Sequence, residues 1–208
     1  MPKKIILIRH GETDHNKQGK AQGWLDVSLN KTGLKQAQKL ARRLKDEVID
    51  VIYTSDLKRA FQTTKPFSKL KKIKPIKTKK VREWNMGTWA DKTWDKIQKE
   101  FAHIFDEKGD LTDQDWKGHA GESINEVFSR AEKFLKELSK KHPGKTVVVT
   151  THGGTKKRIL KLLGILRMDE NPKINNTGVT ILEKDKDGKY KATVFNDASH
   201  LEDYGSKR

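Results

Sequence analysis

Short apolar runs alternate with polar, glycine-bearing segments along this chain. Residues 5–8 form a run that is too short for a helix and rich in β-branched side chains, so they predict a buried strand. Thr32 then opens a stretch with apolar side chains at helical spacing, which predicts an amphipathic helix. The predicted inner face of that helix consists of Leu34, Ala37, Leu40, Ala41 and Leu44.

A second strand and helix repeat this arrangement. Residues 50–53 predict a strand, and Ser55 or Asp56 is placed to cap the helix that follows. We expect that helix to end near Pro66, because proline disfavours a helical conformation in the residue before it. Residues 73–81 are basic and partly alternating, and they predict a third strand.

The middle of the chain is aromatic and irregular from Trp84 onward. We expect a helical insertion there, over about residues 84–120, that covers one end of the sheet. Its tryptophans suit either a core or a substrate contact, because aromatic side chains bury large areas in both. Ser123 and Glu126 then form a capping box that begins a long amphipathic helix reaching Pro143.

The last third of the chain returns to short strands. Residues 147–150 are the clearest strand, and they lead directly into His152 and a further helix. Residues 176–182 and 190–195 flank an Asp-Gly dipeptide and predict an antiparallel pair. Together the pattern predicts an α/β fold, a three-layer α/β/α sandwich with a mostly parallel central sheet and one antiparallel edge strand. We expect a single domain over residues 1–208.

Composition removes several classes of protein. The chain has no cysteine, which excludes a disulfide framework, a cysteine-ligated zinc site and a cysteine nucleophile. No segment approaches the roughly 18–20 consecutive apolar residues of a membrane span, and the N-terminus lacks the features of a signal peptide. We therefore expect a cytoplasmic protein without a membrane partner.

The formal net charge of +17 would attract polyanions, whether nucleic acid, acidic membranes or small phosphorylated molecules. Much of the excess is lysine between Lys65 and Lys80, for which a solvated surface is the ordinary interpretation. Apart from Phe67, that stretch has no aromatic side chains on which bases could stack. Nucleic acid is therefore disfavoured as a partner despite the charge.

Reactive side chains follow four of the predicted strands. Arg9 and His10 close the first, Arg59 follows the second, Glu83 the third and His152 the fourth. Ligands of open α/β sheets bind at the carboxyl ends of the strands. Two imidazoles, two guanidiniums and one carboxyl group could therefore face a common point, provided that these strands are neighbours.

Phosphoryl transfer requires such a set: a nucleophile in line with the leaving oxygen, cations around the equatorial oxygens and an acid for the leaving group. A neutral histidine nitrogen is available as a nucleophile at physiological pH, and arginine meets phosphate in two parallel hydrogen bonds. A metal site is the other interpretation of His10, Glu12, Asp14 and His15, but their spacing matches neither the zinc helix nor the calcium loop pattern. No metal is expected.

The run Leu7-Ile8-Arg9-His10-Gly11-Glu12-Thr13 closely resembles the signature of the histidine phosphatase superfamily, the phosphoglycerate mutase-like proteins, and the chain resembles the broad-specificity phosphatases of its branch 1. The resemblance continues in order along nearly the whole chain. The further matching segments are Gln22-Gly23, Ser55-Asp56-Leu57 with Arg59, Arg82-Glu83, Gly121-Glu122-Ser123 and Thr151-His152-Gly153-Gly154.

This resemblance implies a role for each site residue. His10 would become phosphorylated, while Glu83 would donate and then recover a proton. The phosphoryl group and substrate would be held by Arg9, Asn16, Gln22, Gly23, Arg59, His152 and Gly153, of which Gln22 and Gly23 would line the entrance. The family's chemistry implies no metal and no cofactor.

The first hypothesis is therefore a phosphomonoester hydrolase that acts on a small phosphorylated metabolite through phosphohistidine. A 2,3-bisphosphoglycerate-dependent phosphoglycerate mutase is the alternative. Such mutases carry additional basic residues in the insertion, whereas the segment from Trp84 to Trp116 has lysines but no arginine. A third hypothesis is a catalytically silent, basic nucleic-acid-binding protein. Nothing in the sequence indicates an oligomeric state or names the metabolite.

Overall fold

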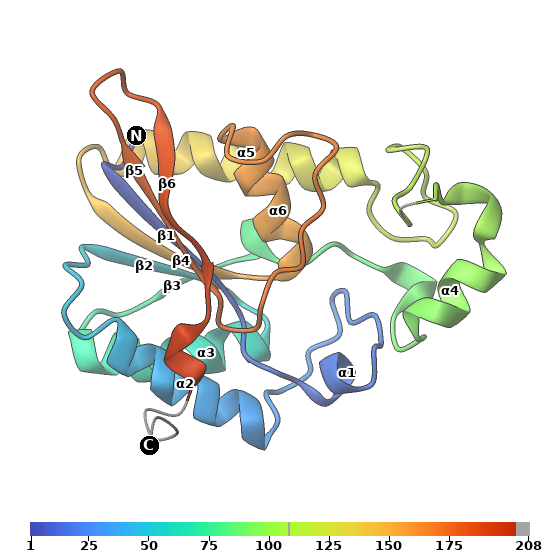
Figure 1. Cartoon of the computed structure of the whole chain (residues 1–208), viewed down its shortest axis with the longest axis horizontal. Helices are drawn as coiled ribbons and strands as arrows, with labels where there is room; N and C mark the ends of the chain where they lie inside the picture. The colour runs from blue at the N-terminus through green and yellow to red at the C-terminus, as the bar shows by residue number, and fades with distance from the viewer. Residues whose placement is uncertain (108, 203–208) are drawn as a thin grey trace.

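The computed structural model describes residues 1–107 and 109–202. These residues form a six-stranded sheet in the order β3-β2-β4-β1-β5-β6, with helices on both faces (Figure 1). The strands are β1 (Lys4–Arg9), β2 (Val51–Ser55), β3 (Ile76–Thr78), β4 (Thr146–Thr151), β5 (Val179–Lys184) and β6 (Tyr190–Asp197). The helices are α1 (Asp14–Lys17), α2 (Lys31–Arg43), α3 (Lys58–Lys71), α4 (Trp94–Glu100), α5 (Ile124–Lys141) and α6 (Gly153–Leu162), with 3₁₀ turns η1 (Lys79–Val81), η2 (Gly87–Trp89), η3 (Ala102–Ile104) and η4 (Ser199–Leu201).

The sheet confirms the predicted α/β sandwich with a mostly parallel sheet. Strands β1 to β4 run parallel, with β4 between β1 and β2. The strand that runs against the others is β5, and β6 pairs outside it. The antiparallel strand therefore lies one place in from the edge, because the final hairpin adds two strands beside β1 instead of one.

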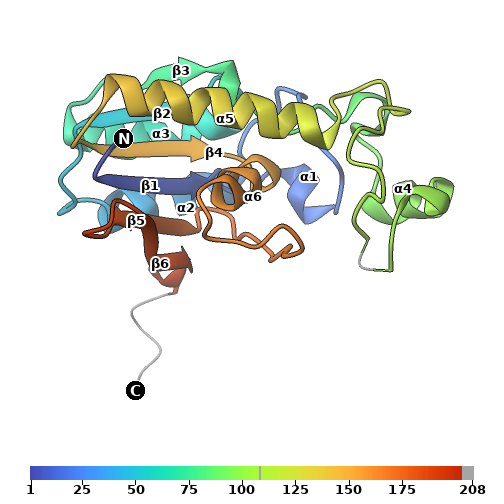
Figure 2. The same cartoon turned by 90° about the horizontal axis from the view of Figure 1, so that it is seen from above.

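The two faces of the sheet are covered by different helix pairs. Helices α2 and α3 lie on one face and α5 and α6 on the other (Figure 2). Alternate residues of β1 serve the two cores, with Ile6 and Ile8 packing toward α2 and Ile5 and Leu7 toward α5. All four are essentially inaccessible to solvent, as expected for a parallel strand that is buried on both sides.

Local signals explain where most helices begin. The capping box at Ser123 and Glu126 is present as predicted, with each side chain bonded to the other residue's backbone N–H. Helix α2 begins one residue early because Asn30 caps it through a hydrogen bond from Gly33 N–H. Leu34 was predicted to face the core and is instead 48% exposed, since the buried stripe of α2 runs through Gly33 and Ala37.

Helix α3 departs from its prediction at both ends. Neither Ser55 nor Asp56 caps it; the helix follows Leu57, and Asp26 Oδ1 accepts from Lys58 N–H. It also continues beyond Pro66 to Lys71. Proline removes one helical hydrogen bond, but Phe67 next to it is fully buried in the core under α2, and this packing favours continuation. The predicted strand at 73–81 shortens to β3.

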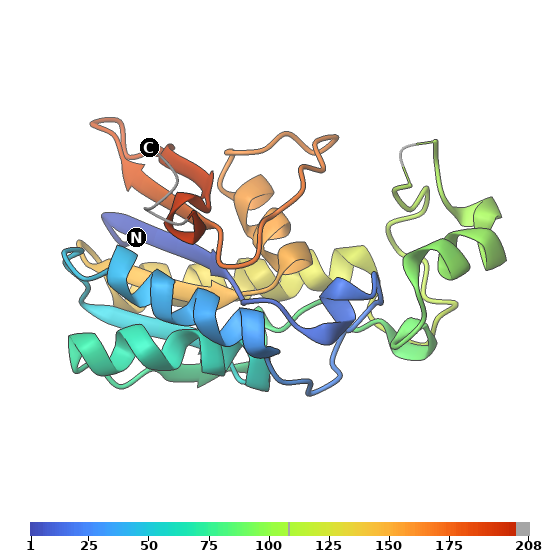
Figure 3. The same ribbon diagram turned by 60° about the horizontal axis from the view of Figure 1, so that its bottom comes forward.

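The aromatic insertion stands beyond the carboxyl ends of the parallel strands (Figure 3). Its core is a cluster of rings around the fully buried Trp89, which lies against Trp84, Phe101, Phe105, Trp116 and His119. The tryptophans therefore differ in what they contact. Trp89 belongs to the core of the insertion, whereas Trp84 and Trp94 also line a cleft.

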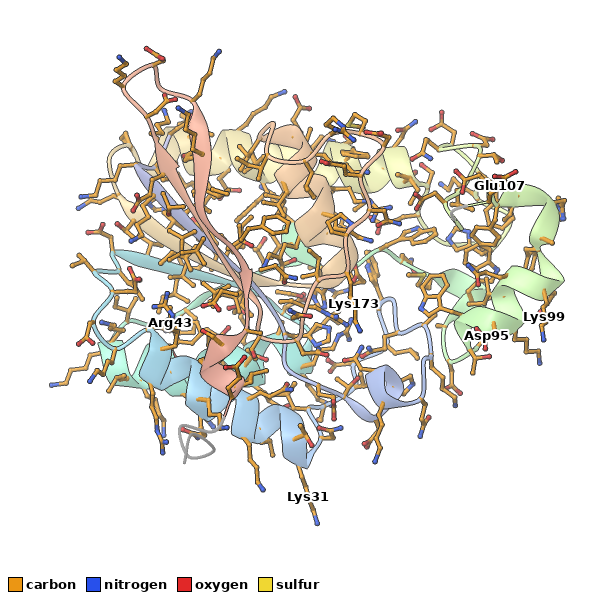
Figure 4. All side chains as sticks on the ribbon, in the orientation of Figure 1. Lys31, Arg43, Asp95, Lys99, Glu107 and Lys173 are labelled. Carbon is orange, nitrogen blue, oxygen red and sulfur yellow. The ribbon has the colours of Figure 1, made fainter. Side chains whose placement is uncertain are left out.

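Charged side chains cover the outside of the fold. Lys31 on α2 and Lys99 on α4 are exposed and extend away from their helices (Figure 4). Most lysines of the basic stretch, such as Lys69 and Lys77, are exposed as well. No helix in the described part of the chain is long and apolar enough to cross a membrane.

Candidate active site

Two histidines lie side by side at the carboxyl end of the sheet. The parallel register of β1 and β4 pairs Arg9 with Thr151, so the residues that follow, His10 and His152, leave the sheet together. Their ring centroids are 5.1 Å apart, and the ring planes make an angle of 58°. Both side chains are buried, at 2% and 0% exposure. Strand pairing thus joins residues that are far apart in sequence.

His10 is held in one tautomer. Its Nδ1 lies 2.7 Å from the carbonyl oxygen of Gly11. Because a carbonyl only accepts, Nδ1 carries the proton and Nε2 carries the lone pair. Burial, followed by the charges of Arg59 and Arg9, lowers the pKa of His10 well below its usual range. The imidazole is therefore neutral at physiological pH, with a nucleophilic nitrogen.

His152 shares these surroundings. Burial lowers its pKa well below the usual range, and the nearby charge of Arg59 adds to the effect. In the described part of the chain, neither of its ring nitrogens has a hydrogen-bond partner. It is also the N-cap of α6 but gives that helix no side-chain hydrogen bond.

The two arginines are fixed by backbone carbonyl groups. Arg59, fully buried on α3, donates to the carbonyls of Leu25 and Gly23, at 2.7 Å each. Arg9 donates through Nη1 to Ile174 O at 2.5 Å. Burial lowers the pKa of Arg59 to about 10, although nearby carboxylates oppose this.

Several buried nitrogen atoms at this point lack partners among the described residues. They are Nε of Arg9, Nε of Arg59 and both ring nitrogens of His152. Leaving a buried polar group without a hydrogen bond costs about 1–3 kcal/mol, and more for a charged one. Donors of this kind, carried by two cations beside a neutral histidine, suit a small anion with several oxygens.

The side chain of Glu83 lies against the first turn of α6. Its Oε2 accepts from Gly154 N–H and its Oε1 from Thr155 N–H, each at 3.0 Å. Glu83 thereby takes the capping place that His152 leaves open. An added Cβ at Gly154 would lie only 2.5 Å from Oε1, so the approach depends on glycine. At Gly153 the nearest atom would be Arg9 Nε, at an ordinary 3.5 Å.

The segment that carries Glu83 is anchored by residues that sequence reasoning missed. Arg130 of α5 donates to the carbonyls of Arg82 and Glu83 and forms an ion pair with Glu122 at 2.9 Å. Trp24 Nε1 donates to Glu83 O at 2.7 Å. The only sequence feature that could have indicated Arg130 is its position two turns into a capped helix. The sequence does not indicate which residues it would contact.

The remaining predicted residues form the loop around the site. Asn16 Oδ1 accepts from Thr13 N–H at 3.2 Å, and Gln22 Oε1 accepts from the Thr13 hydroxyl at 3.0 Å. Gly23 has φ +49°, and a Cβ there would lie 2.7 Å from Met86 N. The structure thus brings all of the predicted residues to one end of the sheet, with Asn16 and Gln22 bonded within the loop.

Two further polar residues support His10 and were not predicted. Thr63 Oγ1 accepts from Gly11 N–H at 2.9 Å and donates to Arg59 O at 2.7 Å, which couples α3 to the histidine loop. Asn176 Nδ2 donates to His10 O at 3.0 Å. The spacing of Thr63, one turn after Arg59, could have indicated its position.

Beyond Glu83 a cleft of about 650 Å³ opens between the insertion and α6. Glu83 and Gly154 border it, so the carboxyl group lies where the cleft meets the start of α6, the helix that follows His152. Across residues 1–107 and 109–202, no group of three or more His, Asp or Glu side chains is arranged to hold a metal ion.

Comparison with known proteins gives consistent matches. The family described as "Histidine phosphatase superfamily (branch 1)" matches residues 5–197. The chain is 36% identical to "Phosphoglycerate mutase-like protein 4" of Arabidopsis thaliana, over 97% of this chain and 88% of that protein. It is 33% identical to the "Metal-independent phosphoserine phosphatase" of the same plant, over 97% and 84%. The solved structure "Bacillus stearothermophilus YhfR" superposes with a TM-score of 0.82 at 31% identity, over 97% and 100%.

The glycine under Glu83 provides a first test. In Gly154→Ala the new methyl group would displace the Glu83 carboxyl group, so we expect kcat to fall at least tenfold, given the usual worth of a positioned acid. Gly188→Ala, in the turn between β5 and β6 with no atom within 4 Å of an added Cβ, is the control and should keep kcat near that of wild type. Steady-state kinetics on a phosphomonoester compares the two. Equal losses would contradict the account of Glu83.

The buried Lys156 provides a test by pH. It donates to Gly178 O at 2.7 Å, and burial lowers its pKa from 10.5 to about 7. Between these pH values the unfolded chain keeps a proton that the folded chain has released, so stability rises with pH. From pH 7 to 9 we expect the unfolding free energy of wild type to rise relative to Lys156→Met by on the order of 2 kcal/mol. Urea denaturation measures this difference; exposed Lys35→Met should follow wild type, and parallel curves for Lys156→Met would refute the shift.

Proposed function

The chain belongs to branch 1 of the histidine phosphatase superfamily, and we propose on that premise that it hydrolyses phosphomonoesters of small metabolites through a phosphohistidine at His10. The observation that carries this proposal is the neutral His10, whose Nε2 lone pair lies beside buried, partnerless nitrogens of Arg9, Arg59 and His152. A dianionic phosphoryl group supplies the oxygens that those nitrogens lack.

In the first step, His10 Nε2 attacks phosphorus in line with the ester oxygen. The phosphorus–nitrogen bond forms while the phosphorus–oxygen bond breaks, and Glu83 gives its proton to the departing oxygen. The lowered pKa of His10 keeps the attacking nitrogen unprotonated throughout the physiological range. The alcohol then leaves from the Glu83 side, where the cleft opens.

In the second step, water takes the place of the alcohol. Glu83, now a carboxylate, removes a proton from water as its oxygen attacks phosphorus, and the phosphorus–nitrogen bond breaks. Inorganic phosphate leaves, and both His10 and Glu83 return to their starting protonation states. One carboxyl group therefore serves as acid and then as base.

Arg9, Arg59 and His152 hold the equatorial oxygens in both steps. At an effective dielectric constant near 20, each close charge pair contributes on the order of 4 kcal/mol. Because carbonyl groups already fix the two guanidiniums, little reorganisation accompanies the reaction. Asn16, Gln22, Gly23 and Gly153 shape the surrounding loop and helix start. Phosphoserine is the first substrate to test, since relatives are named phosphoserine phosphatases.

Trapping of the intermediate tests the nucleophile. Wild type mixed with a radiolabelled phosphomonoester and quenched in alkali should carry a base-stable, acid-labile label, whereas His10→Ala should carry none and lose turnover. His103→Ala, which removes an exposed histidine of η3, should label normally. Turnover should survive a metal chelator. Wild-type turnover by His10→Ala would end the proposal, as would inactivation by the chelator.

Leaving-group dependence tests the acid. In Glu83→Gln we expect kcat to fall by about 10²–10⁴ on an alkyl phosphate, whose alkoxide needs a proton to leave. An aryl phosphate should lose much less in the first step, because phenolate leaves unaided. Glu132→Gln, at an exposed pair with Lys136, is the control and should behave as wild type. Equal losses on both esters would exclude Glu83 as the proton donor.

A further inference from the structure

One wall of the cleft beyond Glu83 is cationic. Helix α6 presents Lys157, Arg158 and Lys161 there, while the insertion and the first turns of α5 form the opposite wall. The opposite wall includes apolar side chains such as Trp84 and Phe128. A cleft of about 650 Å³ lies within the range of small-molecule sites and is larger than a phosphoryl group requires. It therefore has room for the group to which the phosphate is attached.

The three cations of this wall differ in what they contact. Lys157 Nζ donates to Asn171 Oδ1, and Lys161 Nζ donates to Met168 O at 2.6 Å, so both fasten the segment after α6. Arg158 donates through Nη1 to Gly154 O, on its own helix, at 3.2 Å. Arg158 thus has donors left for a ligand, since a guanidinium carries five N–H groups.

No carboxylate among the described residues forms an ion pair with Arg158. The charges of Glu83 and Asp110 act on it from a greater distance, yet burial outweighs both and lowers the pKa of Arg158. Burial and the charge of Arg158 lower the pKa of neighbouring Lys157 to about 8. The carboxylates that border the cleft are engaged elsewhere, as Asp110 accepts from Asn171 and Asp106 from Asp110 N–H. Neutral amide donors do not cancel the charge of these carboxylates, so the feature that distinguishes Arg158 is the lack of a direct ion pair within the described residues.

Arg158 lies on the leaving-group side of the reaction. A Cβ built on Gly154 would be 2.5 Å from Glu83 Oε1 and 3.3 Å from Arg158 Nη1, so the two side chains flank the same point. Glu83 gives its proton to the leaving oxygen under the proposed function. The atoms attached to that oxygen therefore pass next to the guanidinium of Arg158.

We propose that Arg158 binds a carboxylate on the leaving group, so that the enzyme prefers phosphomonoesters of hydroxy acids to those of neutral alcohols. This inference rests on the proposed function and adds its substrate class. A carboxylate matches one guanidinium in charge and in planar, two-oxygen geometry. A second phosphate would bring two charges toward Glu83 and Asp110, which disfavour it.

Matched substrates isolate the carboxylate. O-phosphoserine and O-phosphoethanolamine differ only in that the second lacks the carboxylate. In a second pair, glycerol 3-phosphate has a hydroxymethyl group where 3-phosphoglycerate has the carboxylate. For each pair, the ratio of kcat/KM values measures the preference. We expect wild type to prefer the carboxylate member at least tenfold, because hydrogen bonds between charged groups are stronger than those between neutral groups.

Variants then assign the preference to a residue. Arg158→Gln should reduce both ratios about tenfold or more, mainly through KM of the carboxylate substrates. Arg158→Lys keeps the charge and should retain part of the preference, which also guards against a folding defect in the glutamine variant. Arg42→Gln, an exposed arginine at the end of α2, is the control and should keep the wild-type ratios. Thermal melting checks that each variant folds.

The outcomes distinguish a failure of the carboxylate site from a failure of the proposed phosphatase function. Wild-type ratios near one, with a normal His10 label, would overturn the carboxylate site and leave the phosphatase standing. Equal loss on both members of each pair in Arg158→Gln would also overturn it and would instead make Arg158 a positioning residue for Glu83. Absence of the His10 label with every ester would overturn both proposals.

Discussion

Burial of two guanidiniums that have no carboxylate partner within residues 1–107 and 109–202 is the constraint around which this end of the fold is built. Arg59 is fully buried, and the carbonyl groups of Gly23 and Leu25 accept its hydrogen bonds. A buried cation left without partners is strongly unfavourable, so the loop that supplies these carbonyls must fold over α3. That loop turns at Gly23, where positive φ and the nearness of Met86 both require glycine. Arg9 imposes the same demand on the segment before β5 through Ile174.

The same constraint sets the protonation of the histidines. Burial lowers the pKa values of His10 and His152, and the two nearby cations lower them further, which keeps both imidazoles neutral. The Gly11 carbonyl then selects the tautomer of His10. Nucleophilicity thus follows from packing and charge, without a separate base. The N–H groups of α6 go to Glu83, which ties the proton donor to the helix that begins at His152.

Much of this could be predicted from the sequence because it rests on local signals. Strand and helix periodicity gave the fold class, and the four strand ends gave His10, Glu83, Arg59 and His152. Signals that depend on tertiary packing failed. Helix α3 continues through Pro66 because Phe67 is buried beside it, and Leu34 is exposed because Gly33 takes the place against the loop. Contacts between residues far apart in sequence cannot be predicted from residue spacing. An example is the hydrogen bond from Asn176 to the backbone carbonyl of His10.

Arg158 shows most clearly why position in the fold must be known before chemistry is assigned. In the sequence it is one of several cations in Lys156-Lys157-Arg158, and such runs are usually solvated. In the structure the three side chains have different surroundings. Lys156 is buried in the core, Lys157 forms a hydrogen bond with the segment after α6, and Arg158 lines the cleft. Under the proposed function, the sheet positions the residues that hold the phosphoryl group through β1 and β4, whereas the leaving group enters the cleft lined by α6, α5 and the insertion. Because the strand register does not constrain those walls, we expect substitutions there, away from the contact between Gly154 and Glu83, to alter substrate choice and leave the chemistry of His10 intact. The presence of a phosphoserine phosphatase and a phosphoglycerate mutase-like protein among the relatives is consistent with that division.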